Sequence, residues 1–220
     1  MPEEIGGSVI GMRSFGDREP RARQVLDRLG SLLAERTGRA ATIRPVAELD
    51  DATRERILDL NTAAFGREGE AFDHRALDEV AADPDALLVV LELDGAIEAC
   101  CFGYYEDPGT ETVDGTDYFF DSGMVAPEWQ GHGIAAVGGA AMMLLVALLG
   151  DVHRVGIEVW GGGGRADDLV DLYRRFGFTD ATGRDFSHRY LAVDLDAGTV
   201  RSWYEALGLD ADPGAAGSGT

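Results

Sequence analysis

The sequence predicts an α/β protein whose central sheet mixes antiparallel and parallel strands. Two apolar segments, 86–93 and 96–105, flank Asp94-Gly95, a dipeptide typical of a tight β-hairpin. Later in the chain, strand-like and helix-like segments alternate, an order that requires parallel pairing. Because a hairpin is antiparallel, we expect a mixed sheet.

The first 40 residues are predicted to form an extension with one amphipathic helix, over 17–36, that ends at Gly38. Its apolar side chains recur at helical spacing: Val25, Leu26, Leu29, Leu32 and Leu33. Seven arginines and six acids nearly balance in this segment, so the net charge of −21 lies downstream. We expect this helix to pack on the main domain or on a second subunit, and its arginines make it the candidate contact of a homodimer.

The main domain is expected to span 41–195. A short strand over 42–46 precedes a helix that Asp50 or Asp51 can cap, and a second short helix covers about 73–82. The later elements follow in order: a mobile turn over 107–117, a strand ending at Val125, a helix over 134–149, a strand over 152–160, a helix over 166–176 and a strand over 187–195. Residues 196–220 are assigned one further helix and a flexible tail.

One stretch, over 118–149, has the form of a ligand site. Its strand cannot continue past Pro127, and Gly131 and Gly133 lead into a long apolar helix. Glycines let a ligand approach the backbone, while the first N–H groups of a helix have no partner within it. These donors and the positive end of the helix favour an anion such as a pyrophosphate, with no need for a lysine or a metal.

Two motifs sharpen this hypothesis. Gln130, Gly133 and Ala135 fit Gln/Arg-x-x-Gly-x-Gly/Ala after Val125-x-Pro127, and residues 172–178 read Leu-Tyr-Arg-Arg-Phe-Gly-Phe. Together and in this order they resemble the GNAT superfamily of acyl-CoA-dependent N-acetyltransferases. The resemblance implies a mixed, mostly antiparallel sheet with a V-shaped splay between two central parallel strands, and helices on both faces. It also implies acetyl-CoA as co-substrate and direct attack of a primary amine on its acetyl group.

A dinucleotide-binding loop is the competing interpretation. Gly131-His-Gly-Ile-Ala-Ala136 also satisfies Gly-x-Gly-x-x-Ala, and Glu158 lies 25 residues after Gly133. This interpretation fits less well because Pro-Glu-Trp-Gln separates the strand from the glycines. In addition, Glu158 lies inside its strand instead of at the strand's end.

The resemblance assigns the co-substrate contacts. The backbone N–H of Val125 would hold the thioester oxygen, and pantetheine would lie along Met124, Val125 and Ala126. Phosphate contacts fall on one loop: Gln130, Gly131, His132, Gly133, Ile134 and Ala135. For His132, a part in the structure of the loop is favoured. The family often has an asparagine where this chain has Ala166, so that contact is lost or supplied by backbone.

Three residues are the candidates for catalysis. Tyr173 matches the tyrosine that protonates the leaving thiolate in many family members, and its alternative is packing beside Phe176 and Phe178. For the base, Asp121 lies four residues before Val125 and is expected on the same strand face as Gly123 and Val125. Glu158 is the other candidate, because burial in an apolar strand would raise its pKa. Either acid could instead be a hydrogen-bonded structural residue.

The charge of −21 argues against nucleic-acid and anionic-membrane partners. Acids crowd the segments expected near the acceptor: Glu68, Glu70, Asp73, Glu106, Asp107, Glu111, Asp114 and Asp117. We therefore predict a small cationic amine as acceptor, although a solvated or salt-adapted surface explains the acidity equally well. The alternatives are acetylation of a protein N-terminus or lysine, and an acyl-CoA-binding regulator without acetyl transfer.

The two cysteines and four histidines show no ligand spacing, so no metal site is expected. Cys100 and Cys101 are adjacent on a predicted strand and should point to opposite faces, which rules out an ordinary disulfide between them. They are expected to be buried in a reducing compartment. With no secretory pattern at the N-terminus, the sequence predicts a cytoplasmic protein.

Overall fold

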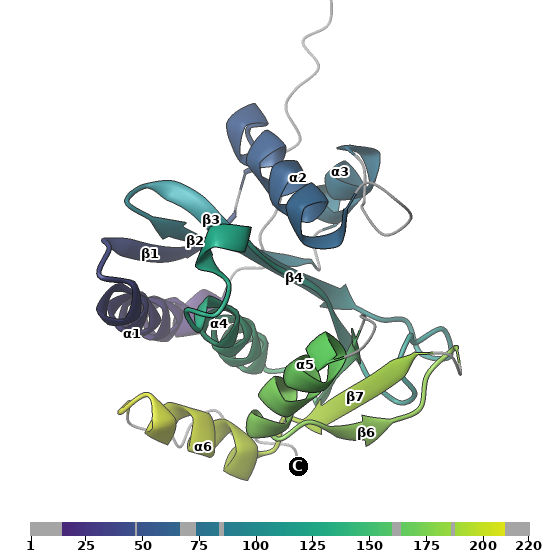
Figure 1. Cartoon of the computed structure of the whole chain (residues 1–220). Coiled ribbons are helices and arrows are strands. Elements are labelled where there is room, and N and C mark those ends of the chain that lie inside the picture. The colour runs from purple at the N-terminus through teal and green to yellow at the C-terminus, as the bar shows by residue number, and fades with distance from the viewer. Residues whose placement is uncertain are drawn as a thin grey trace, which may run out of the picture.

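The computed structural model describes residues 15–46, 48–66, 74–83, 86–159, 164–185 and 188–209, and shows one seven-stranded sheet with helices on both faces (Figure 1). The strands are β1 (Ala41–Pro45), β2 (Leu87–Leu93), β3 (Ala96–Tyr105), β4 (Tyr118–Val125), β5 (Arg154–Val159), β6 (Thr179–Ala181) and β7 (Arg189–Asp194). They lie in the order β1-β2-β3-β4-β5-β7-β6. All neighbours pair antiparallel except β4 and β5, which confirms the mixed, mostly antiparallel sheet.

Six α-helices are seen in the described residues: α1 (Glu19–Thr37), α2 (Asp51–Phe65), α3 (His74–Ala82), α4 (Ile134–Leu149), α5 (Gly164–Arg175) and α6 (Ala197–Ala206). α2 and α3 cover one face of the sheet, and the other four lie on the opposite face (Figure 1). Cys100 packs in the core under α2, whereas Cys101 packs in the core beneath α4. The predicted opposite orientation of the two thiols is therefore confirmed.

Local sequence signals account for most element boundaries. The Asp50 carboxylate accepts a hydrogen bond from the Thr53 N–H at 2.7 Å and caps α2, as predicted. Gly38 ends α1 in the left-handed conformation with φ of 67°. The hairpin turn places Asp94 and Gly95 at φ of 50° and 83°, where glycine and aspartate are tolerated best.

The first helix, α1, packs against α4 and β1 of its own chain through fully buried Val25, Leu29 and Leu33. The Arg18 guanidinium near its start donates to the carbonyl of Leu148 at 2.8 Å, at the end of α4. Farther along, the Arg28 guanidinium donates to the carbonyl of Leu207 at 2.8 Å, just after α6. Of the two expected packing sites for this helix, the structure shows the main domain. A homodimer stays a prediction.

The two parallel strands separate after a short ladder. Their register pairs only Tyr118 with Val155, Phe119 with Gly156 and Phe120 with Ile157. β4 then continues to Val125 and β5 to Val159 without pairing each other. This is the V-shaped splay that the sequence resemblance implied.

Two segments differ from the predicted secondary structure. β6 was not predicted, since three residues carry too little periodicity to be recognised. The turn over 107–117, predicted to be mobile, is packed into the fold at its centre: Val113 is fully buried and bridges Gly183, while Glu106 accepts hydrogen bonds from the Thr112 N–H at 2.7 Å and the Thr116 hydroxyl at 2.9 Å. The loop predicted at 67–70 and the tail over 210–220 lie outside the described residues. Among the helices described, none is both long and apolar enough to cross a membrane.

Candidate functional site

A cavity of about 870 Å³ lies beside the part of β4 that has left β5. β4 contributes Gly123 and Val125 to its wall, and the end of α2 contributes Ala64 and Phe65. The remaining lining residues come from the loop into α4, from α5 and from α1: Trp129, Gln130, Gly131, Gly133, Ile134, Ala135, Ala136, Asp168, Leu169, Leu172, Arg175 and Arg36. Five elements far apart in sequence thus meet at one cavity.

The loop into α4 has the conformation that its glycines allow. Gly131 and Gly133 adopt φ of 84° and 77°, a region that side chains with a Cβ rarely enter. Gly133 is the N-cap of α4 and offers no side chain to the first turn, so the N–H groups there have no side-chain cap. A ligand with acceptor oxygens would satisfy them, and a phosphate is suited to this place.

The backbone of Val125 faces the splay. The N–H of Ala126 donates to the carbonyl of Glu98 at 2.9 Å, toward β3. Because backbone groups of successive strand residues point to opposite edges, the N–H and C=O of Val125 point away from β3. Consistent with this, the Gln130 side-chain amide donates to the Val125 carbonyl at 3.1 Å. The loop is thereby tied to the strand at the position where an acyl oxygen is expected.

The predicted co-substrate residues divide into two groups. Val125, Gln130, Gly131, Gly133, Ile134 and Ala135 line the cavity. The side chains of Met124 and Ala126 instead pack in the core under α2, so only their backbone can serve a ligand on the cavity side. His132 is not a lining residue: its Nδ1 lies 3.3 Å from the Gln130 carbonyl oxygen, and its ring packs edge-on against Trp129 at 5.5 Å.

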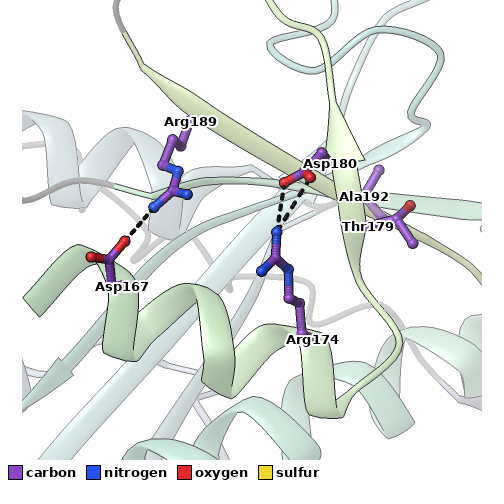
Figure 2. Close-up of polar contacts among 6 residues, drawn as sticks. All are labelled: Asp167, Arg174, Thr179, Asp180, Arg189 and Ala192. Atoms are coloured by element: carbon purple, nitrogen blue, oxygen red, sulfur yellow. Dashed lines mark hydrogen bonds and ion pairs between the residues drawn. The ribbon is translucent and has the colours of Figure 1, made fainter. Parts of the chain in front are cut away.

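α5 is held over the edge of the sheet by two ion pairs, shown in Figure 2. Arg174 contacts Asp180 of β6 at 3.2 Å, and Arg189 of β7 contacts Asp167 at 2.7 Å. Both ion pairs are exposed, whereas the buried side chains of Ala166 and Val170 pack α5 against the core. The other side of the helix, which includes Leu172 and Arg175, lines the cavity.

Tyr173 lies beside the apex of the splay. Its ring makes edge-on contacts with Phe120 at 6.2 Å and Phe178 at 5.5 Å, and Phe120 is the last β4 residue of the parallel ladder. Burial raises the pKa of the Tyr173 hydroxyl, which therefore stays protonated in the physiological range. A neutral hydroxyl can donate a proton, although the cavity-lining residues include Leu172 and not Tyr173.

Asp121 does not share a face with Gly123 and Val125, and that prediction is wrong. The register shifts between Phe102 and Gly103, which leaves Asp121 as an extra residue in β4. Its carboxylate accepts hydrogen bonds from the Tyr104 hydroxyl at 3.2 Å and the Ser122 hydroxyl at 3.0 Å. Burial raises the pKa of Asp121, and these two hydrogen bonds partly oppose the rise.

Glu158 is the first β5 residue beyond the ladder, just as Asp121 is the first in β4. It pairs in register with Tyr190 of β7, so it lies on the same face as Tyr104 and Asp121. The side chain of Glu158 is 11% exposed, and its carboxylate contacts Nδ1 of His188, which is 30% exposed. The two candidate bases thus flank the apex of the splay on one face of the sheet.

Four of the five described acids that were expected to steer a cation accept hydrogen bonds within the chain. Glu106 holds the 107–117 turn, and the Asp117 carboxylate accepts from the N–H groups of His153 and Arg154, both at 2.9 Å. Glu111 accepts from the Gly109 N–H at 2.8 Å, which lowers its pKa. The Thr182 hydroxyl donates to Asp114 at 2.5 Å. Glu68, Glu70 and Asp73 lie outside the described residues.

No protein-family model and no curated protein sequence matches the chain, but solved structures do. The ribosomal-protein-S18-alanine N-acetyltransferase of Escherichia coli aligns at 17% identity over 71% of this chain and 94% of its own, with a TM-score of 0.51. An N-acetyltransferase from Staphylococcus aureus aligns at 16% identity over 71% and 99%, with a TM-score of 0.52. The GNAT domain of S. lividans PAT aligns at 16% identity over 72% and 93%, with a TM-score of 0.53.

The chain has the GNAT fold. The alignment with the E. coli structure leaves more than a quarter of this chain without a counterpart there. In the part of the GNAT fold described here, no group of three or more histidine, cysteine, aspartate or glutamate side chains is placed to hold a metal ion.

Sequence reasoning missed several residues at the site, among them two arginines, Tyr104 and His188. Arg175 could have been found, since it follows cavity-lining Leu172 by three residues on one helix. Strand register places Tyr104 beside Asp121 and His188 beside Glu158, and the two GNAT motifs carry no information on register. Arg36 reaches the carbonyl of Gly133 across 97 residues of sequence and has no local signal at all.

Proposed function

We propose that this protein transfers the acetyl group of acetyl-CoA to a primary amine by direct attack. One observation carries the proposal: a single cavity joins the loop before α4, whose N–H groups suit a pyrophosphate, to the backbone of Val125, whose N–H suits a thioester oxygen. In a dinucleotide-binding protein, a backbone N–H at the point where two strands separate would have no role. The loop geometry also fits the predicted contacts of Gln130, Gly131 and Gly133.

In this proposal each residue has a defined task. Acetyl-CoA supplies an activated thioester carbonyl. The Val125 N–H donates to the carbonyl oxygen and stabilises the negative charge that grows there as the amine nitrogen attacks. Tyr173 gives a proton to the sulfur as the C–S bond breaks; its hydroxyl is protonated at neutral pH, and burial, which raises its pKa, makes it a weaker acid than an exposed tyrosine. The attacking amine loses one proton to a carboxylate.

Asp121 is the preferred base. Burial raises its pKa, which brings a carboxylate closer to the proton affinity that a base needs near neutral pH. Hydrogen bonds from Tyr104 and Ser122 hold it at the apex of the splay. Glu158, backed by His188, is the second candidate on the same face.

The acceptor in this proposal is a small cationic amine. Support comes from the two carboxylates at the apex, Asp121 and Glu158, and from the overall charge of −21. Hydrogen bonds within the chain hold the carboxylates of Glu106, Glu111 and Asp117, which keep their charge and add to the field of the protein but are not free to pair with a ligand. The E. coli neighbour's name, with an alanine of ribosomal protein S18 as acceptor, supports a protein N-terminus as the alternative.

An assay of CoA release with a panel of amines, at low and high salt, tests this function. We expect the highest rates with small polycationic amines, and we expect rates below saturation to fall as the salt concentration rises through about 0.1 M, where the Debye length is about 10 Å. A peptide with a free N-terminus and a lysine peptide belong in the same panel. If an anionic amine or a peptide gave the highest rate in the panel, the proposed acceptor would be wrong. Binding of CoA without release on any acceptor would favour a regulator.

A further inference from the structure

Two arginines from distant elements line the cavity: Arg36, near the end of α1, and Arg175, at the end of α5. Among the described residues that line it, Asp168 is the only acid, so this part of the wall carries more positive than negative charge. The whole chain, in contrast, has 40 acids against 19 basic residues. A local excess of arginine on so acidic a protein points to an anionic ligand.

Arg36 places a positive charge at the start of a helix. Its guanidinium lies at the start of α4, within 3.3 Å of the Gly133 carbonyl oxygen, and a Cβ built on Gly133 would be 2.9 Å from its Nη1. The start of a helix carries partial positive charge, so a cation there is unfavourable. An anion bound between the helix start and the guanidinium would reverse the sign of this interaction.

Helix capping does not explain Arg36, as a comparison with two other arginines shows. Arg18 and Arg28 each donate at 2.8 Å to a carbonyl at the end of a helix, where carbonyls lack partners within the helix. The Gly133 carbonyl, however, already accepts the helical hydrogen bond from the Val137 N–H at 3.2 Å. Its contact with the exposed Arg36 is longer and adds no missing partner.

Arg175 and the preceding Arg174 also differ in what they contact. Arg174 contacts Asp180 of β6 (Figure 2) and is not among the residues that line the cavity. Arg175, one residue later on α5, lines the cavity with Leu172. The two arginines of the cavity therefore approach it from α1 and from α5.

We propose that Arg36 and Arg175 bind phosphate groups of the acyl carrier, which makes the N-terminal helix a working part of the site and not only a packing element. This inference rests on the proposed function, because it takes coenzyme A as the ligand. The guanidinium matches phosphate oxygens with paired donors, and this chain has no lysine to do so. The loop before α4 and the two arginines would then divide the pyrophosphate and the 3′-phosphate between them.

The test measures dissociation constants by calorimetry for CoA, 3′-dephospho-CoA and pantetheine. The variants are Arg36→Gln and Arg175→Gln, with Arg23→Gln and Arg174→Gln as matched controls on the same helices. Both controls remove the same charge from a surface ion pair outside the cavity. Melting temperatures without ligand show whether each variant keeps its fold, which we expect because both cavity arginines are exposed.

We expect Arg36→Gln and Arg175→Gln each to weaken CoA binding roughly tenfold or more, the loss typical of one charge-assisted hydrogen bond, and to leave pantetheine binding unchanged. A loss that disappears with 3′-dephospho-CoA assigns the arginine to the 3′-phosphate, and a loss that persists assigns it to the pyrophosphate. Wild-type affinity for CoA in both variants would overturn the inference and leave the proposed function standing. Failure of the wild-type protein itself to bind CoA would overturn both.

Discussion

The two sides of the splay are built by opposite means. On the cavity side, next to α4 and α5, the candidate contacts are backbone N–H groups and two arginines, all suited to anions. On the other face, at the apex, Asp121 and Glu158 present carboxylates suited to a cation. The sheet thus separates two regions of opposite charge that meet where β4 leaves β5. An acidic protein can therefore offer a positively charged wall to an anion when a few arginines are placed at one cavity.

The largest expected effect comes from the acidic side. Asp121→Asn should lower kcat by ~10²- to 10⁴-fold, the range of general-base catalysis, with little change in CoA affinity. The wild-type rate should fall as pH drops through the raised pKa of Asp121, since the base must be deprotonated, and this limb should vanish in the variant. Rate profiles across pH measure this.

Glu158→Gln is the matched comparison, because this residue occupies the equivalent position on β5. We expect it to keep most of the activity. The folded-state pKa of Asp121 is raised, so its contribution to stability is present in acid and lost as pH rises through that pKa. Asp121→Asn should therefore not destabilise the protein at neutral pH. An inactive Glu158→Gln beside an active Asp121→Asn would move the base to Glu158.

The next largest effect is expected at the loop before α4, on the cavity side of the splay. Gly133→Val should abolish the stabilisation by CoA, which for the wild type is ~2.7 kcal/mol at 100 times the dissociation constant. The left-handed φ of 77° and the nearby Arg36 guanidinium both disfavour a side chain here, so a modest fall in melting temperature without ligand is also expected. Thermal melts with CoA and with NAD give the measurement. A shift with NAD alone would restore the dinucleotide interpretation.

A smaller effect is expected at the apex itself. Tyr173→Phe keeps the ring that packs on Phe120 and Phe178 and removes only the hydroxyl. We expect kcat to fall about tenfold with CoA affinity unchanged, as when one interaction is made only in the transition state. Unchanged turnover would show that Tyr173 serves packing alone.

The smallest effect concerns the cysteines on the two faces. Burial raises the pKa of Cys101 to about 12 and that of Cys100 as well, so neither thiol is ionised at neutral pH. An alkylating reagent should therefore leave the folded protein unmodified and react with both thiols in denaturant. Mass spectrometry before and after unfolding checks this. Rapid alkylation of Cys101 in the folded protein would mean that the core beneath α4 opens.

The sequence was informative where the backbone makes the site. Glycines at 131 and 133 and the proline at 127 leave a readable pattern, because each is needed for a particular backbone shape. The acidic side gave a weaker signal. One extra residue in β4 reverses the alternation of side chains between the two faces of the sheet and moves Asp121 to the other face. No local sequence pattern predicts such a bulge. Arg36 was missed because only tertiary packing brings α1 to the loop.

The contacts of α1 also have a consequence for the order of folding. This helix joins α4 through Arg18 and Leu148, which are 130 residues apart, and joins α6 through Arg28 and Leu207, 179 residues apart. Closing such long loops costs entropy that only later contacts repay, so α1 should dock after the hairpin of β2 and β3 and after α4 have formed. The cavity that Arg36 lines is then complete only at the end of folding. A nascent chain would hold a finished sheet before it could hold a ligand.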